Sequence, residues 1–101
     1  MLRSQIRIPR KKLAEFCRRN HIHKLSLFGS VVHDSFNIDS DIDVLVEFDP
    51  EHIPGFALIR MEDELSAILR GRKVDLVTPK FLNHRIRQQV EAEAAVQYAQ
   101  E

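Results

Sequence analysis

The sequence predicts an α/β fold, a small mixed β-sheet of three to four strands with helices packed on one face. Two observations predict this class. Short apolar runs with the alternation of β-strands occur at residues 24–28, 42–48 and 72–77. Segments whose apolar residues recur at helical spacing lie around them, at residues 9–20, 56–70 and 79–90. Helices that pack on one face leave the other face open to solvent or to a ligand.

The first helix is expected over residues 9–20, with Pro9 in its first turn and Asn20 at its end. Its apolar positions are Leu13, Phe16 and Cys17. After the first strand, residues 30–33 are expected to form a single helical turn and residues 34–40 a loop. The second strand then covers residues 42–48.

The second helix, over residues 56–70, has the clearest apolar stripe. The stripe consists of Leu58, Leu65, Ile68 and Leu69. Three acidic residues in a row, Glu62, Asp63 and Glu64, are interpreted as largely solvated. Gly71 suits the C′ position, where glycine often ends a helix.

The C-terminal third begins with the strand at residues 72–77. Thr78 is a good N-cap and Pro79 a good first residue for the last helix. The apolar residues of this helix are Leu82, Ile86 and Val90. For residues 94–98 two alternatives stay open, an extension of the helix and a short edge strand.

Composition indicates one domain over residues 1–101. Apolar residues make up 44% and charged residues 30% of the 101 positions, as in ordinary soluble proteins. No apolar run reaches the ~20 residues of a membrane span. Cys17 is the single cysteine, which excludes a disulfide framework and a cysteine zinc site. We therefore expect a cytoplasmic protein.

The most informative segment begins where the first strand ends, at Gly29-Ser30, and continues to Asp41-Ile42-Asp43. Residues two apart in a strand project to the same face, so Asp41 and Asp43 stand side by side. At that separation two carboxylates repel by about 3 kcal/mol at an effective dielectric of about 20. A divalent cation relieves this repulsion, and hard oxygen ligands favour Mg²⁺.

A phosphate site and a third carboxylate complete the pattern. Gly29 allows close backbone approach, and Ser30 offers a hydroxyl and an amide that can hold a phosphate. Asp75 is the polar residue of the third apolar strand. If that strand pairs with the second, Asp75 joins the other two aspartates. Such a cluster clamps a nucleoside triphosphate through metal ions, which predicts nucleotide chemistry.

The spacing of Gly29-Ser30, Asp41-Ile42-Asp43 and the later Asp75 resembles the signature of the polymerase-β-type nucleotidyltransferase superfamily. The short chain and the phrase SDIDVLVEF look like the minimal nucleotidyltransferase (MNT) domains within it. The resemblance implies Mg²⁺ as cofactor and ATP as nucleotide donor. It also implies that Asp41, Asp43 and Asp75 are catalytic metal ligands and that Gly29 and Ser30 bind the triphosphate.

The resemblance further implies a partner. Members of this group commonly act as antitoxins that transfer AMP from ATP to a tyrosine of a HEPN-domain ribonuclease toxin, with which a hetero-oligomer is expected. The chain departs from the family at His33-Asp34, where Arg-Gly is usual. Histidine does not replace the bidentate arginine charge at pH 7. An antitoxin that acts by steric binding alone therefore stays open. Nucleotidyl transfer to a small molecule is a separate alternative.

The formal net charge of zero hides a basic N-terminus. It contains Arg3, Arg7, Arg10, Lys11, Lys12, Arg18, Arg19 and Lys24 against the single acid Glu15. A solvated helix face and a surface for a polyanion or an acidic partner are both open interpretations. A protein partner is favoured over nucleic acid, whose binding would weaken steeply with salt.

Overall fold

The computed structural model describes residues 8–29, 41–51, 55 and 57–99. Its elements are α1 (Arg10–Arg19), β1 (Ile22–Phe28), β2 (Ile42–Phe48), α2 (Ala57–Ile68), β3 (Val74–Val77), the 3-10 helix η2 (Pro79–Phe81), α3 (His84–Glu93) and β4 (Ala95–Ala99). The turn and loop predicted between the first two strands lie outside the described residues. The predicted second strand coincides with β2 residue for residue.

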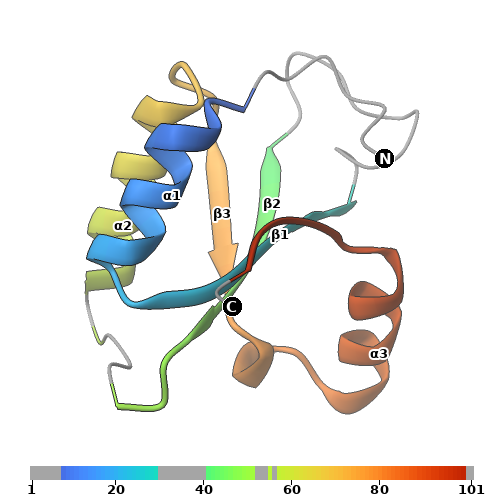
Figure 1. Cartoon of the computed structure of the whole chain (residues 1–101). Helices are drawn as coiled ribbons and strands as arrows, with labels where there is room; N and C mark the ends of the chain where they lie inside the picture. The colour runs from blue at the N-terminus through green and yellow to red at the C-terminus, as the bar shows by residue number, and fades with distance from the viewer. Residues whose placement is uncertain (1–7, 30–40, 52–54, 56, 100–101) are drawn as a thin grey trace.

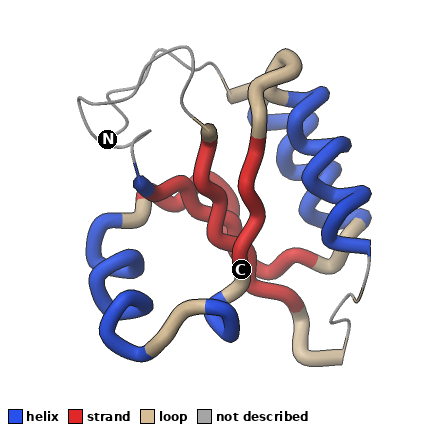
Figure 2. The backbone as a smooth tube through the Cα atoms, turned by 180° about the vertical axis from the view of Figure 1, so that it is seen from behind, coloured by secondary structure: helices blue, strands red, loops and turns tan. Residues whose placement is uncertain are grey.

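The four strands form one mixed sheet in the order β3-β2-β1-β4. β1 is antiparallel to both β2 and β4, whereas β2 and β3 are parallel. Figures 1 and 2 show the strands between α1 and α2 on one side and η2 and α3 on the other. α1 and α2 provide the buried helical residues, and α3 provides none. The predicted class, a small mixed sheet with helices packed on one face, is confirmed.

One face of the sheet forms the hydrophobic core with α1 and α2. Strand residues of this face alternate along the chain, except at the register shift between Ile22 and Lys24 of β1. The buried set includes Leu13, Phe16 and Cys17 of α1, Ile22, Leu25 and Leu27 of β1, Ile42, Val44 and Val46 of β2, and Met61 and Leu65 of α2. Met61 was absent from the predicted stripe of α2, although it lies one turn before Leu65.

The opposite face is less open than the sequence predicted. Ser26 and Leu45 are register partners on β1 and β2. Their side chains point away from the core with α1 and α2, yet their exposed fractions are only 1% and 2%. The middle of this face is therefore covered, whereas Asp43 and Glu47, two residues to either side of Leu45, are half-buried.

α2 ends in a Schellman motif, one residue away from the predicted arrangement. Gly71 N–H donates to Ser66 O over 2.7 Å, and Arg70 N–H donates to Ala67 O over 3.2 Å. These two bonds make Arg70 the C′ residue, with φ +63°, and Gly71 the residue after it, with φ +80°. The sequence prediction of Gly71 at C′ was wrong because it assumed that the left-handed position must hold the glycine.

The last helix begins later than predicted. Thr78 makes no side-chain cap bond, and Pro79 starts the short helix η2 instead. Asn83 is the N-cap of α3, because its Oδ1 accepts a hydrogen bond of 2.9 Å from Ile86 N–H. Of the two alternatives for the tail, the edge strand is correct, since β4 pairs with β1.

The acidic run of α2 is not merely solvated. Glu64 forms an ion pair with Arg19, which links α2 to α1. Glu62 Oε2 accepts a hydrogen bond of 2.9 Å from Leu76 N–H, which links α2 to β3. Only Asp63 of the three is a plainly exposed residue.

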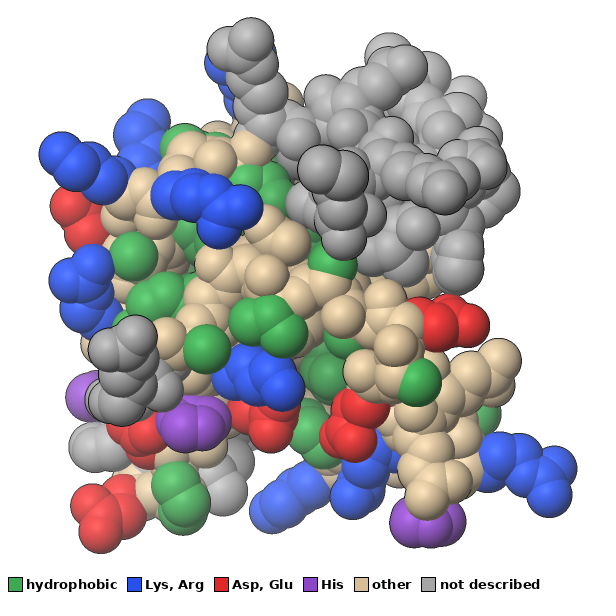
Figure 3. All heavy atoms as spheres, turned by 45° about the vertical axis from the view of Figure 1, so that its right-hand side comes forward, with side chains coloured by type: hydrophobic (Ala, Val, Ile, Leu, Met, Phe, Trp, Pro, Cys, Tyr) green, Lys and Arg blue, Asp and Glu red, His purple; other side chains and the backbone are tan. Residues whose placement is uncertain are grey.

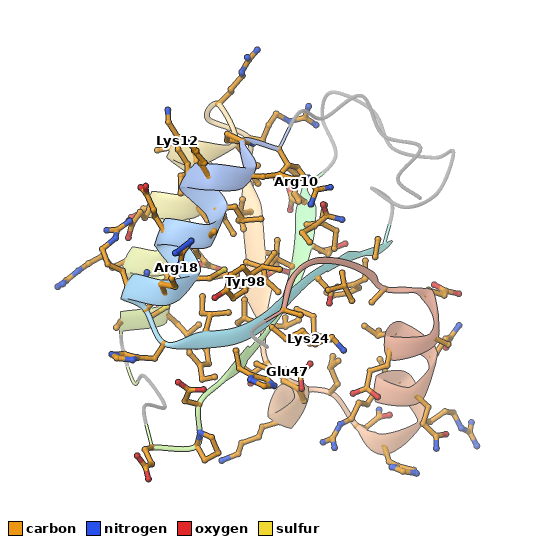
Figure 4. The ribbon with its side chains drawn as sticks, viewed as in Figure 1. Arg10, Lys12, Arg18, Lys24, Glu47 and Tyr98 are labelled. Atoms are coloured by element: carbon orange, nitrogen blue, oxygen red, sulfur yellow. The ribbon has the colours of Figure 1, made fainter. Side chains whose placement is uncertain are left out.

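Part of the basic N-terminal run is likewise engaged within the domain. Besides Arg19, Lys24 Nζ lies 3.9 Å from Glu47 Oε2, and Figure 4 shows these two side chains together on β1 and β2. On the face drawn in Figure 3, charges of both signs are interspersed rather than gathered in one field. None of the described helices has the length and apolar character needed to cross a bilayer.

Asn83→Ala should destabilise α3 by about 1 kcal/mol, the usual value of an N-cap side chain. α3 buries no residue, so its stability depends unusually on such local bonds. Amide hydrogen exchange of α3 measures the effect directly. Thr78→Ala is the control. Thr78 does not cap α3 in the structure, so this substitution should leave hydrogen exchange of the α3 amides unchanged. Equal losses in both variants would contradict the assigned helix start.

Candidate functional site

The site begins at Gly29, directly after β1. Its φ of +75° lies in the left-handed region that favours glycine. A Cβ atom at this position would collide with Oδ2 of Asp43 and would lie 3.2 Å from Asp43 Cγ. The backbone conformation therefore disfavours a side chain at this position, and the lack of space excludes one. Gly29 allows the end of β1 to lie against the Asp43 carboxylate.

Asp43 and Asp75 are register partners on the parallel strands β2 and β3. Neighbouring strands lie about 4.8 Å apart, and paired residues project to the same face. Asp75 thus joins Asp43 as the sequence predicted for adjacent second and third strands. Asp43 is half-buried and Asp75 is exposed, so a ligand would meet Asp75 first.

The pKa of Asp43 is shifted by its surroundings. Burial raises the pKa of its carboxyl above the usual value, and the charges of Asp75 and then Asp41 raise it further. All three effects disfavour the ionised form. A cation bound beside Asp43 would compensate the charges of Asp75 and Asp41 and so would oppose their effect on the Asp43 pKa.

Asp41 lies just before β2 and is exposed. Its Oδ2 is 4.0 Å from Lys73 Nζ, a pair whose side chains are 47% and 82% exposed and whose attraction is therefore weak. The backbone of Lys73 is held more firmly, since Lys73 O accepts a 2.8 Å hydrogen bond from Ile42 N–H. Sequence reasoning missed Lys73, although a cation two residues before Asp75 was visible.

The donor set suits a hard cation, because carboxylate oxygens are the ligands that Mg²⁺ prefers. Asp43 and Asp75 come from the neighbouring strands β2 and β3, and Asp41 directly precedes β2. Over the described residues, however, no three His, Cys, Asp or Glu side chains are gathered closely enough to hold a metal ion. The exposed side chains of Asp41 and Asp75 would have to turn toward Asp43 on binding.

Three residues of the sequence motif cannot be placed, and two reactive side chains, Cys17 and Tyr98, belong to the core or pack against it. Ser30, His33 and Asp34 lie outside the described residues, so only the Gly29 half of the predicted phosphate cradle is located. The buried thiol of Cys17 has its pKa raised to about 12, chiefly by burial, and therefore stays uncharged at neutral pH. Tyr98 packs against the hydrophobic core.

Comparison with known proteins identifies this arrangement. The family model described as a nucleotidyltransferase domain matches residues 10–96, a range that contains Gly29 and all three aspartates. The chain belongs to this family.

Two curated relatives of the nucleotidyltransferase domain are protein adenylyltransferases by name. MntA of Thermococcus cleftensis is 38% identical over 73 residues, which cover 71% of each chain. A Methanocaldococcus jannaschii protein assigned as an adenylyltransferase is 38% identical over 64 residues, 62% of this chain and 63% of that protein. The chain thus matches slightly less than two thirds of the length of this second relative.

Solved structures share the nucleotidyltransferase fold. A structure assigned as a minimal nucleotidyltransferase is 33% identical, with a TM-score of 0.71 over 84% of this chain and 85% of that one. A toxin–antitoxin complex with AMP-PNP has a TM-score of 0.73 at 23% identity, over 92% and 75% of the two chains. An MNT antitoxin bound to the tri-AMPylated HEPN toxin of Shewanella oneidensis has a TM-score of 0.65 at 24% identity, over 90% and 70%.

Asp43→Asn should raise the melting temperature of the nucleotidyltransferase domain by a few degrees at pH 7 in EDTA. The folded state holds the Asp43 proton more tightly than the unfolded chain, whose pKa is about 3.9. Stability from this group is therefore full below that pKa and is lost as pH rises through the folded pKa. Asp43→Asn cannot ionise and therefore avoids this loss of stability. Near pH 3, where Asp43 is protonated, the two proteins should have the same melting temperature.

Thermal unfolding followed by circular dichroism at both pH values measures this difference. The exposed residue Asp63 provides the control, since Asp63→Asn removes an equal charge without relieving the crowding. A destabilised Asp43→Asn protein at pH 7 would contradict the proposed electrostatic strain.

Proposed function

We propose that the chain is a Mg²⁺- and ATP-dependent nucleotidyltransferase that transfers AMP to a tyrosine hydroxyl of a partner HEPN toxin and so acts as its antitoxin. One observation carries the proposal: Asp43 and Asp75 are paired across β2 and β3 at the point where Gly29 meets the Asp43 carboxylate. The family match and the adenylyltransferase names of the relatives support the reaction class.

Asp41, Asp43 and Asp75 would hold the Mg²⁺. When bound, the metal supplies charge compensation for the triphosphate and for the departing pyrophosphate. Gly29 leaves its backbone accessible beside these carboxylates, and Ser30 is proposed to bind the phosphates with it. Lys73 adds a positive charge next to Asp41.

In the transfer, the acceptor hydroxyl oxygen forms a bond to the α-phosphorus of ATP. The bond from that phosphorus to the oxygen bridging to the β-phosphate breaks, and pyrophosphate leaves with the electron pair. The hydroxyl proton passes to a carboxylate, for which we assign Asp75, and then to water. Asp75 suits this role because it is more exposed than Asp43 and faces an incoming acceptor first.

The partner is inferred from the complexes whose fold the chain shares, an MntA antitoxin with its toxin and an MNT antitoxin with an AMPylated HEPN toxin. A toxin with an accessible tyrosine would approach the end of the sheet that bears the aspartates. The added phosphodiester charges would repel RNA from the toxin's active site. We assign this action to the cytoplasm, where ATP is supplied.

A steric antitoxin without transfer is the second candidate. It is favoured by the described carboxylates, which do not close into a group of three, and by the pairing of Asp41 with Lys73. In that case the sheet end would serve as a binding surface, and the substitution of Asp41 and Asp43 by asparagine would leave neutralisation intact.

Purified partner toxin, mixed with this protein and Mg-ATP, should gain the mass of one or more AMP groups on a tyrosine. Intact-mass spectrometry with peptide mapping measures the gain. The Asp43→Asn protein is the matched control and should add none. Neutralisation of the toxin with no increase in its mass would contradict the enzyme and favour the steric antitoxin.

Asp75→Asn should lower the transfer rate by about 100-fold, the lower end of what a positioned proton acceptor contributes. Asp75→Asn should reduce ATP affinity less than Asp43→Asn does, because Asp43 lies against Gly29, where the phosphates are proposed to bind. Single-turnover rates and calorimetric ATP titrations separate the two quantities. An equal loss of ATP affinity in both variants would show that the roles have been divided wrongly.

A further inference from the structure

Two polar side chains of α2 bond to the backbone of the segment that forms β3. Glu62 Oε2 accepts a hydrogen bond of 2.9 Å from Leu76 N–H. Ser66 Oγ donates a hydrogen bond of 2.6 Å to Arg72 O. Both contacts are partly buried, so water competes for them less than at an open surface. The two bonds attach α2 to the entry and to the middle of the same short strand.

The sequence spacing of Glu62 and Ser66 along α2 matches the sequence spacing of their partners Leu76 and Arg72 along the β3 segment. Glu62 and Ser66 are four apart in α2 and therefore lie on one side of the helix, a turn from each other. This row is adjacent to the buried residues Met61 and Leu65, which seat the helix on the core. Because α2 and β3 run in opposite directions, the later helix residue meets the earlier strand residue.

β3 needs such support. It has four residues, lies at the edge of the sheet and pairs only with β2 among the described strands. The N–H of Leu76 bonds to α2 rather than to β2, so it belongs to the outer edge of the strand. Val74 and Leu76 fix the apolar side of the strand in the core, and the hydrogen bond from Leu76 N–H to Glu62 supports its outer backbone edge.

Asp75 lies inside the supported segment. The peptide whose N–H bonds to Glu62 joins Asp75 to Leu76, and Arg72 precedes Asp75 by three residues. The Asp75 side chain is exposed, so the path of its backbone decides where its carboxylate stands relative to Asp43.

We propose that Glu62, assisted by Ser66, is a positioning residue that keeps Asp75 in register with Asp43, so that the two carboxylates can turn onto one cation. The proposal rests on the function proposed for Asp75. Glu62 contacts neither nucleotide nor acceptor and acts through the backbone of β3. A carboxylate on the opposite side of the strand from the site would thus determine how well the site binds its cation.

The test compares Glu62→Ala, Glu62→Gln and the control Asp63→Ala. Glu62→Ala removes the acceptor, whereas the amide oxygen of Glu62→Gln can still accept from Leu76 N–H. Asp63→Ala removes the same charge from the neighbouring exposed position. Mg²⁺ affinity is measured by calorimetry without partner, and kcat for AMP transfer with the partner toxin, both at temperatures where circular dichroism shows each variant folded.

Glu62→Ala should weaken Mg²⁺ binding and lower kcat by roughly 10-fold to 100-fold, the range for groups that orient a metal ligand. The KM for ATP, measured at saturating Mg²⁺, should change less than kcat. Glu62→Gln and Asp63→Ala should both match the unsubstituted protein. Exchange of the Leu76 amide hydrogen should quicken in Glu62→Ala only.

The proposal is overturned if Glu62→Ala has a lower melting temperature but unchanged Mg²⁺ affinity and kcat, which is the result of a purely structural bond. It is also overturned if Glu62→Gln is as impaired as Glu62→Ala, since the charge and not the hydrogen bond would then matter. A parent protein that binds Mg²⁺ but transfers no AMP defeats the proposed function alone, and the Mg²⁺ titrations still decide the role of Glu62. A parent protein that binds no Mg²⁺ defeats both.

Discussion

The crowding of negative charge around Asp43 is the constraint on which the rest of the site depends. Asp43 is half-buried on a central strand, with Asp75 opposite it and Asp41 two residues before it. Its raised pKa measures how unfavourable the ionised form is there. The opposite side of β2 carries Val44 and Val46, which are wholly buried. β2 therefore combines a buried face that stabilises the core with carboxylates at its start that repel one another.

The helix behind the sheet makes this arrangement possible. Parallel strands cannot be joined by a tight turn, so the chain must cross from the end of β2 back to the start of β3. α2 makes this crossing and buries Met61 and Leu65 on the way. As a result β2 and β3 both begin at the same end of the sheet, where their aspartates meet. Glu62 and Ser66 then attach the edge strand to the helix.

Stability is distributed unevenly over the domain. α1, β1, β2 and α2 share one continuous core, whereas α3 buries no residue and ends in the edge strand β4. Local opening is easiest where few apolar contacts are lost, which is at α3. The paired aspartates of β2 and β3 belong to the well-packed part, so their geometry does not depend on α3.

The sequence by itself determined the class of the fold and the pairing of chemistry with strands. Alternation defined β2 to the residue, and the spacing of Gly29, Asp41, Asp43 and Asp75 indicated nucleotide chemistry, which the family resemblance narrowed to nucleotidyl transfer. Such patterns are local, since periodicity and same-face spacing follow from backbone geometry alone. The same local reasoning placed the last helix too early, because Thr78 and Pro79 carry a start signal that the fold uses for η2 instead.

Only the tertiary structure decided which residues act at a distance in the chain. That β3 lies beside β2 and parallel to it brings Asp75 to Asp43, and no local pattern specifies strand order. The bond from Glu62 to Leu76, the contact of Gly29 with Asp43 and the burial of Leu45 on the second face arise in the same way. Each joins residues whose proximity is set by packing of the whole domain, where burial and competing contacts override the propensity of any single segment.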